Sequence, residues 1–131
     1  MPLTDQEYTA AAKRTESYLP HMSTAQFRNN IRVTHHVIGL VTEAGELLDH
    51  VKRGIFYGKE ADELRVLEEL GDLQYYAYCL LDAINESTGQ SYTMADIRQM
   101  NINKLAARYP EKFDQDAAIN RDVEAEYAAM R

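Results

Sequence analysis

Apolar side chains recur at three- and four-residue intervals along most of the chain, whereas the two-residue alternation of strands is scarce. Intervals of three and four place side chains on one face of an α-helix. Glycine, proline and polar clusters interrupt the pattern and mark helix ends. The sequence therefore predicts an all-α fold, a compact helical bundle of four to five helices in a single domain. The expected helices span roughly residues 5–18, 23–53, 61–83 and 94–109, with breaks at 54–58 and 85–89 and a weakly helical tail over 114–131.

Two similar acidic motifs lie within the second and third expected helices. The strings EAGEL (residues 43–47) and ELGDL (residues 69–73) share the pattern acid-x-Gly-acid-Leu. At about 100° per residue, each acid pair lies at the margin of an apolar stripe. A short turn joins the two helices, so they are expected to pack antiparallel with their acid pairs facing each other. The four carboxylates belong to Glu43, Glu46, Glu69 and Asp72.

Four carboxylates gathered at a core margin repel one another and need a counter-charge. A hard divalent cation such as Mg²⁺ or Mn²⁺ prefers oxygen ligands and supplies that charge. Neither string contains a histidine or cysteine, which argues against a zinc or haem site. A single acid pair at this spacing is common on a solvated helix face, and only the duplication of the motif favours a metal site.

A glycine stands at the centre of each string, Gly45 in the first and Gly71 in the second. These glycines indicate that another helix packs closely on the face opposite the acids. Each costs about 1 kcal/mol relative to alanine inside a helix, and each faces away from the acids among apolar neighbours. Close packing against a helix of a second copy explains glycine there, so we expect a homo-oligomer assembled through helix packing between subunits. The alternative is that the first helix and the tail cover these faces.

A basic face is expected on the fourth helix, where Asn101, Lys104 and Arg108 follow one another at intervals of three and four. An amide, an ammonium and a guanidinium on one face suit a phosphate chain. Cations near a helix C-terminus are also favoured by the helix dipole, so this signal alone is weak. Lys52, close to the turn between the two acidic helices, is a further candidate cation.

Charge and composition narrow the function further. The net charge of −7, from 21 acids against 14 lysines and arginines, argues against sequence-independent binding to nucleic acid. Cys79 is the single cysteine, so no internal disulfide is expected. No stretch approaches the roughly 18 apolar residues of a membrane span, and the N-terminus lacks the apolar core of a signal peptide. We expect a soluble cytoplasmic protein with no nucleic-acid or membrane partner, acting in the host cytoplasm if it comes from a phage.

Several strings together resemble the MazG-like nucleoside triphosphate pyrophosphohydrolases over roughly residues 30–113. They are GLVTEAGEL (residues 39–47), Lys52 with FYG (56–58), EELGD (68–72) and NINKLAARYPEKF (101–113), in this order. The family signature is a Glu-Glu-x-x-Glu element followed by Glu-x-x-Asp. Thr42 stands at the first glutamate of that signature, which removes one ligand or base.

The resemblance implies an all-α homodimer or homotetramer, the latter a dimer of dimers. It implies Mg²⁺-dependent cleavage of a nucleoside triphosphate between the α- and β-phosphates, with Mn²⁺ able to substitute and two or three ions per site. Purine deoxynucleotides such as dGTP are the first candidate substrates, in nucleotide-pool control or house-cleaning. By position, Glu43, Glu46, Glu69 and Asp72 are the expected metal ligands, Glu46 and Glu43 the expected catalytic carboxylates, and Asn101, Lys104, Arg108 and Lys52 the expected substrate-binding residues.

Two other interpretations stay open. A ferritin-like di-metal protein would use Glu-x-x-His motifs, and neither acidic helix contains one. A non-catalytic nucleotide-binding helical oligomer would need no water-activating carboxylate. Turnover with Mg²⁺ separates an enzyme from such a module, and absorbance from bound iron would identify the ferritin-like protein.

Overall fold

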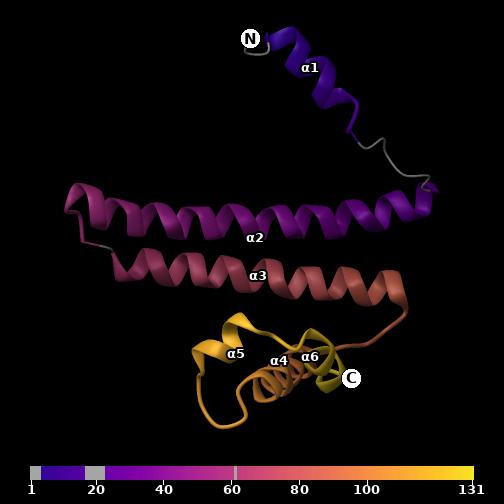
Figure 1. Ribbon diagram of the computed structural model, residues 1–131, viewed down its shortest axis with the longest axis vertical. Helices are drawn as coiled ribbons and strands as arrows, with labels where there is room; N and C mark the ends of the chain where they lie inside the picture. Colours follow the sequence, from indigo (N-terminus) through magenta and orange to yellow (C-terminus); the bar gives the residue numbers. More distant parts are fainter. Residues whose placement is uncertain (1–3, 17–22, 61) are drawn as a thin grey trace.

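The computed structural model describes residues 4–16, 23–60 and 62–131, and these ranges contain helices but no strand. The all-α prediction is therefore confirmed. Within these ranges there are six helices rather than four or five, because the C-terminal tail contributes two short ones. They are α1 (Asp5–Lys13), α2 (Thr24–Tyr57), α3 (Glu63–Thr88), α4 (Met94–Arg108), α5 (Gln115–Ile119) and α6 (Val123–Ala129) (Figure 1).

The two longest helices, α2 and α3, pack along each other as an antiparallel hairpin (Figure 1). Both run past their predicted ends, since α2 continues through Gly54 and α3 continues to Thr88. Each is followed instead by a glycine in the left-handed conformation, with φ of 62° at Gly58 and 70° at Gly89. Glycine adopts this conformation without a steric penalty and commonly ends helices. The predicted break at Gly54 is wrong, because a single glycine costs a helix interior only about 1 kcal/mol and does not by itself end α2.

Side-chain caps define the start of α4. The Asn85 side chain donates to the Tyr92 carbonyl (2.8 Å) and accepts from the Tyr92 amide (3.0 Å), which secures the connection from α3. Thr93 and Asp96 then form a reciprocal capping box at the first turn of α4. Both ends of this helix agree with the prediction, because local capping and the following Pro110 determine them.

The first helix, α1, is shorter than predicted and ends at Lys13, while residues 17–22 lie outside the described part of the chain. Thr15 Oγ1 donates to the Ala12 carbonyl (2.9 Å) just beyond its end. No residue of α1 is buried, and Figure 1 shows this helix standing apart from the α2–α3 hairpin. It therefore does not cover the apolar faces of the hairpin.

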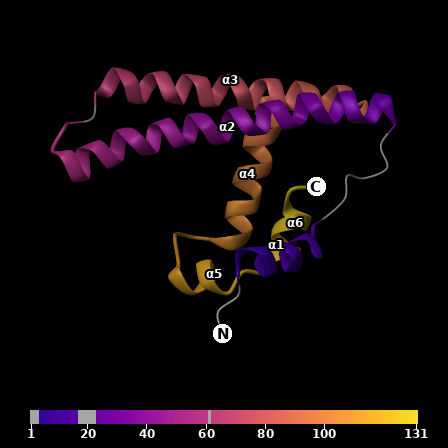
Figure 2. The ribbon, with the colours of Figure 1, turned by 90° about the horizontal axis from the view of Figure 1, so that it is seen from above.

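The last three helices form a smaller group beside the hairpin, in which α4 packs against α6. Figure 2 shows α4 crossing the direction of the hairpin and leading its C-terminal end away from it. The residues 114–131, whose structure the sequence left open, thus return to α4 rather than to α2 or α3. None of the described helices is both long and apolar enough to span a membrane.

Very little of this chain is buried within one protomer. Among the described residues, Ala83 is the one buried hydrophobic residue, whereas Val41, Leu48 and Tyr75 are at least 60% exposed. The accessible surface is 11101 Å², against about 7,000 Å² for a folded monomer of this mass. The chain therefore exposes far more surface than a compact monomer of its mass, and apolar side chains of the hairpin contribute to that surface.

Candidate metal and substrate site

Three of the four predicted metal ligands meet in one layer of the α2–α3 hairpin. Glu43 comes from α2, and Glu69 and Asp72 come from α3; one carboxylate oxygen of each lies within 4.8 Å of the others. Glu69 is 5% exposed, Glu43 is half-buried and Asp72 is exposed. The arrangement arises because equal spacing on antiparallel helices brings the two acid motifs to the same level.

The carboxylates of this layer have no lysine or arginine partner among the described residues. Within residues 4–16, 23–60 and 62–131, no lysine or arginine forms an ion pair with these three carboxylates. Burial, followed by repulsion from Glu46, Asp72 and Glu69, holds the pKa of the Glu43 carboxyl above its ordinary value. Converging oxygen donors with excess negative charge fit a hard divalent cation such as Mg²⁺.

Glu46, the fourth predicted ligand, lies beside this layer rather than within it. It is exposed, and it lines a cavity of about 400 Å³ together with Glu69 at the closed end of the hairpin. The cavity has a mixed lining of acids and bases, so a ligand there would meet charges of both signs. Its other lining residues are Asp49, His50, Arg53, Lys59, Glu60, Asp62 and Arg65.

His50 is a site residue that the sequence analysis did not identify. Its Nε2 lies 3.4 Å from Oε1 of Glu69, and its side chain is 17% exposed. A ring nitrogen at this distance restrains one oxygen of Glu69 and leaves the other oxygen available as a ligand. The available signal was the position of His50 one helical turn after Glu46, on the face that carries the acids.

Lys52 lies outside this cavity lining. Its Nζ is 3.4 Å from Oδ1 of Asp49, and its side chain is 53% exposed. Arg53 also pairs with Asp49, with Nε donating at 2.6 Å. The lysine and arginine residues that line the cavity are Arg53, Lys59 and Arg65, and the substrate-binding role of Lys52 stays a prediction.

The predicted basic face of α4 is not brought to the acidic layer within one protomer. Asn101 is exposed and Lys104 is half-buried, and Figure 2 shows α4 running away from the hairpin. Arg108 donates two hydrogen bonds to Glu126 on α6, which the sequence analysis did not anticipate. If these residues contact a substrate held by the acidic layer, a second copy of the chain must supply one of the two sets.

Comparisons with known proteins give one match. No curated protein and no solved structure matches this chain. A family model matches residues 34–113, more than half of the chain, and it describes the MazG nucleotide pyrophosphohydrolase domain. The matched segment includes both acidic motifs and all of α4, and it ends before α5 and α6.

Proposed function

Since this chain belongs to the MazG nucleotide pyrophosphohydrolase family, we propose that it hydrolyses nucleoside triphosphates to a nucleoside monophosphate and pyrophosphate with the help of a divalent cation. The observation that carries the proposal is the layer of Glu43, Glu69 and Asp72, whose carboxylate oxygens converge with no lysine or arginine paired to them among the described residues. Phosphoryl transfer depends on charge neutralisation and positioning more than on covalent chemistry. An uncompensated carboxylate layer beside an open cavity suits that requirement.

The proposed ligands are Glu43, Glu69 and Asp72, with Glu46 beside them. A divalent cation held there would neutralise charge on the phosphate chain and make water easier to deprotonate. Glu46, which is exposed at the cavity, orients the attacking water and takes its proton. The water oxygen bonds to the α-phosphorus, the bond from that phosphorus to the bridging oxygen breaks, and pyrophosphate leaves with the bonding electrons. His50 holds Glu69 in place.

The finer features of the function are proposed on the same basis. Mg²⁺ is the proposed ion, with Mn²⁺ as a substitute, because both prefer oxygen ligands. Purine deoxynucleotides such as dGTP are the first substrates to test, and the proposed role is control or cleaning of the cytoplasmic nucleotide pool. Lys104 and Arg108 are proposed to contact phosphates across an interface between subunits.

A homodimer or homotetramer is proposed from the uncovered surface of the hairpin. The accessible area is far above that of a compact monomer, and large apolar residues remain exposed on both long helices. A side chain added at Gly45 or Gly71 would meet nothing within 4 Å in this protomer. Both glycines therefore leave room for a helix of a second copy to approach.

Chromatographic analysis of the products tests the reaction. The purified protein is incubated with each common NTP and dNTP in the presence of Mg²⁺, Mn²⁺ or EDTA. We expect metal-dependent monophosphate and pyrophosphate, lost in Glu69→Gln. Glu68→Gln is the matched control, because Glu68 is the exposed neighbour on the same helix and the change in charge is the same. Diphosphate with free phosphate would contradict the proposed bond, and nucleotide binding without turnover would favour the non-catalytic oligomer.

A further inference from the structure

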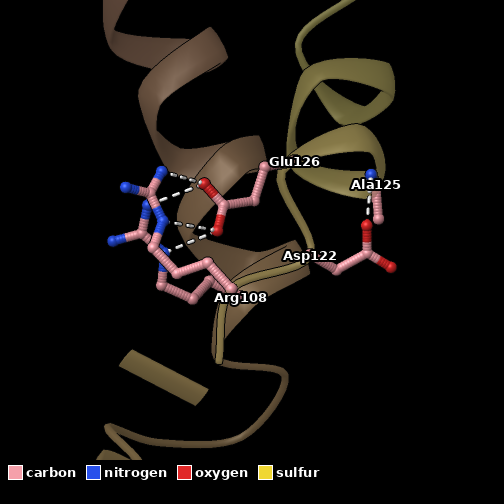
Figure 3. A network of polar contacts seen from close by, with 5 residues as sticks. Arg108, Asp122, Ala125 and Glu126 are labelled. Carbon is pink, nitrogen blue, oxygen red and sulfur yellow. Dashed lines mark hydrogen bonds and ion pairs between the residues drawn. The ribbon is translucent and has the colours of Figure 1, made fainter. Parts of the chain in front are cut away.

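The C-terminal helices surround a glutamate with two arginines. Glu126 of α6 is 3% exposed, and it accepts from Nε (2.8 Å) and Nη2 (2.6 Å) of Arg108. The same carboxylate accepts from Nε (3.2 Å) and Nη2 (2.7 Å) of Arg121. Figure 3 shows this carboxylate facing the Arg108 guanidinium, while Asp122 points the other way and accepts from the Ala125 amide.

The charges of this group do not cancel. Hydrogen bonds from Arg108 and then Arg121 hold the pKa of Glu126 far below its ordinary value, so the group combines one negative and two positive charges. A guanidinium has five N–H donors, and Glu126 accepts two from each arginine. Two adjacent guanidiniums therefore keep further donors and one surplus positive charge, in a chain whose overall charge is −7.

We propose that Arg108 and Arg121, aligned by Glu126, form a binding site for a phosphate-chain anion. Arg121 is then a further binding residue, and Glu126 is a positioning residue that fixes the orientation of both guanidiniums. Planar guanidiniums held in a fixed orientation bind phosphate oxygens in pairs. Lys104 lies one turn before Arg108 on the same face of α4 and adds a third cation.

The proposed anion site lies outside the acidic layer. Arg121 and Glu126 lie beyond the segment that the family model matches. Arg108 is the last residue of α4, and Figure 2 shows the C-terminal end of this helix pointing away from the hairpin. Identification of the anion as the phosphate chain of the substrate rests on the proposed function and on its oligomer, whereas anion binding itself depends on neither.

The rival explanation is that Glu126 serves only to dock α6 onto α4. Arg121 separates the two explanations, because its side chain is 44% exposed and its loss is compatible with a folded group of helices. A purely structural role predicts a change in stability without a change in anion affinity. A positioning role predicts lower affinity in a protein that is still folded.

Calorimetric titration of the full-length, metal-free protein with tripolyphosphate tests the proposal, and circular dichroism confirms that each variant is folded. We expect Arg121→Gln to weaken binding about tenfold, the loss of roughly one charge-assisted interaction. The matched control is Arg98→Gln, which removes the same charge from an exposed position on α4 and should change affinity little. Arg121→Lys keeps the charge but not the paired geometry, so it should not restore full affinity.

Glu126→Gln provides a second, independent test. It removes a negative charge beside the anion, so electrostatics alone predict tighter binding, whereas loss of alignment predicts weaker binding. Weaker binding in both Glu126→Gln and Arg121→Gln supports the proposal. Equal small effects of Arg121→Gln and Arg98→Gln, or tighter binding in Glu126→Gln, would overturn it. Because no metal and no turnover are involved, these outcomes are independent of whether the chain hydrolyses nucleotides.

Discussion

Glu69 on α3 and Glu126 on α6 are both buried, with 5% and 3% of their surface exposed, yet their surroundings are opposite. Glu126 faces two arginines that supply four hydrogen bonds. Glu69 faces Glu43 and Asp72, with the ring of His50 at 3.4 Å. A buried carboxylate is costly unless it is paired. The chain itself supplies two cationic partners for one glutamate, and we propose that a cation from solution is the partner of the other.

The packing of the two regions differs less than the surroundings of their buried glutamates. The group formed by α4, α5 and α6 closes around its buried glutamate, with α4 packed against α6. The α2–α3 hairpin leaves side chains such as Val41 and Leu48 exposed along its length. On the C-terminal helices, Ile102, Ile119 and Tyr127 are also at least 59% exposed, so the two regions differ in the pairing of their buried glutamate and not in apolar coverage.

Metal addition should give the largest difference between the two glutamates. We expect Mg²⁺ to raise the unfolding free energy of the protein, by about 2.7 kcal/mol when the free ion is at 100 times its Kd. Glu69→Gln should abolish this gain, because it removes a ligand, while Glu126→Gln should retain it. Thermal denaturation with and without EDTA measures the effect. Equal metal-induced gains in wild type and Glu69→Gln would show that the acidic layer is not the metal site.

Much of the hairpin could be predicted from sequence, because its determinants are local or repeated. The duplicated acidic motif predicts that Glu43 and Glu69 lie at one level, and the cap at Thr93 predicts the start of α4. The contact of His50 with Glu69 joins residues on different helices, so the spacing of His50 from Glu46 places it on the acidic face but does not identify its partner. The pairing of Arg108 with Glu126 likewise depends on how the tail folds back, which weak helical periodicity does not determine.

Acidification should affect the two regions differently. The raised pKa of Glu43 means that the native state binds a proton more readily than the unfolded state between the ordinary value of 4.5 and the raised value. Metal-free stability of the hairpin should therefore increase as pH falls through that window and decrease as pH rises through it. The lowered pKa of Glu126 has the opposite sign, so its stabilisation is fully present above 4.5 and is lost only as pH falls through its much lower native value.

Amide hydrogen exchange, corrected for the intrinsic pH dependence of exchange, resolves these two responses. From neutrality down toward 4.5, protection of α3 should rise while protection of α6 stays constant. Glu43→Gln should remove the response of α3. With saturating Mg²⁺ the trend in α3 should reverse, because protons and metal compete for the same oxygens. A parallel change in α3 and α6 would contradict the contrast between the two regions.

The smallest expected effect concerns the glycines of the hairpin. A side chain at Gly39 would lie 2.3 Å from the ring of Tyr76, whereas one at Gly71 would meet nothing within 4 Å in this protomer. Gly39→Ala should therefore disturb the packing of α2 on α3.

Gly71→Ala in an isolated protomer should raise stability by up to about 1 kcal/mol, through helix propensity. In the proposed oligomer the added methyl group instead meets the second copy, so association should weaken. Sedimentation over a range of concentrations distinguishes these outcomes, and unchanged association of Gly71→Ala would mean that no helix packs closely at this position.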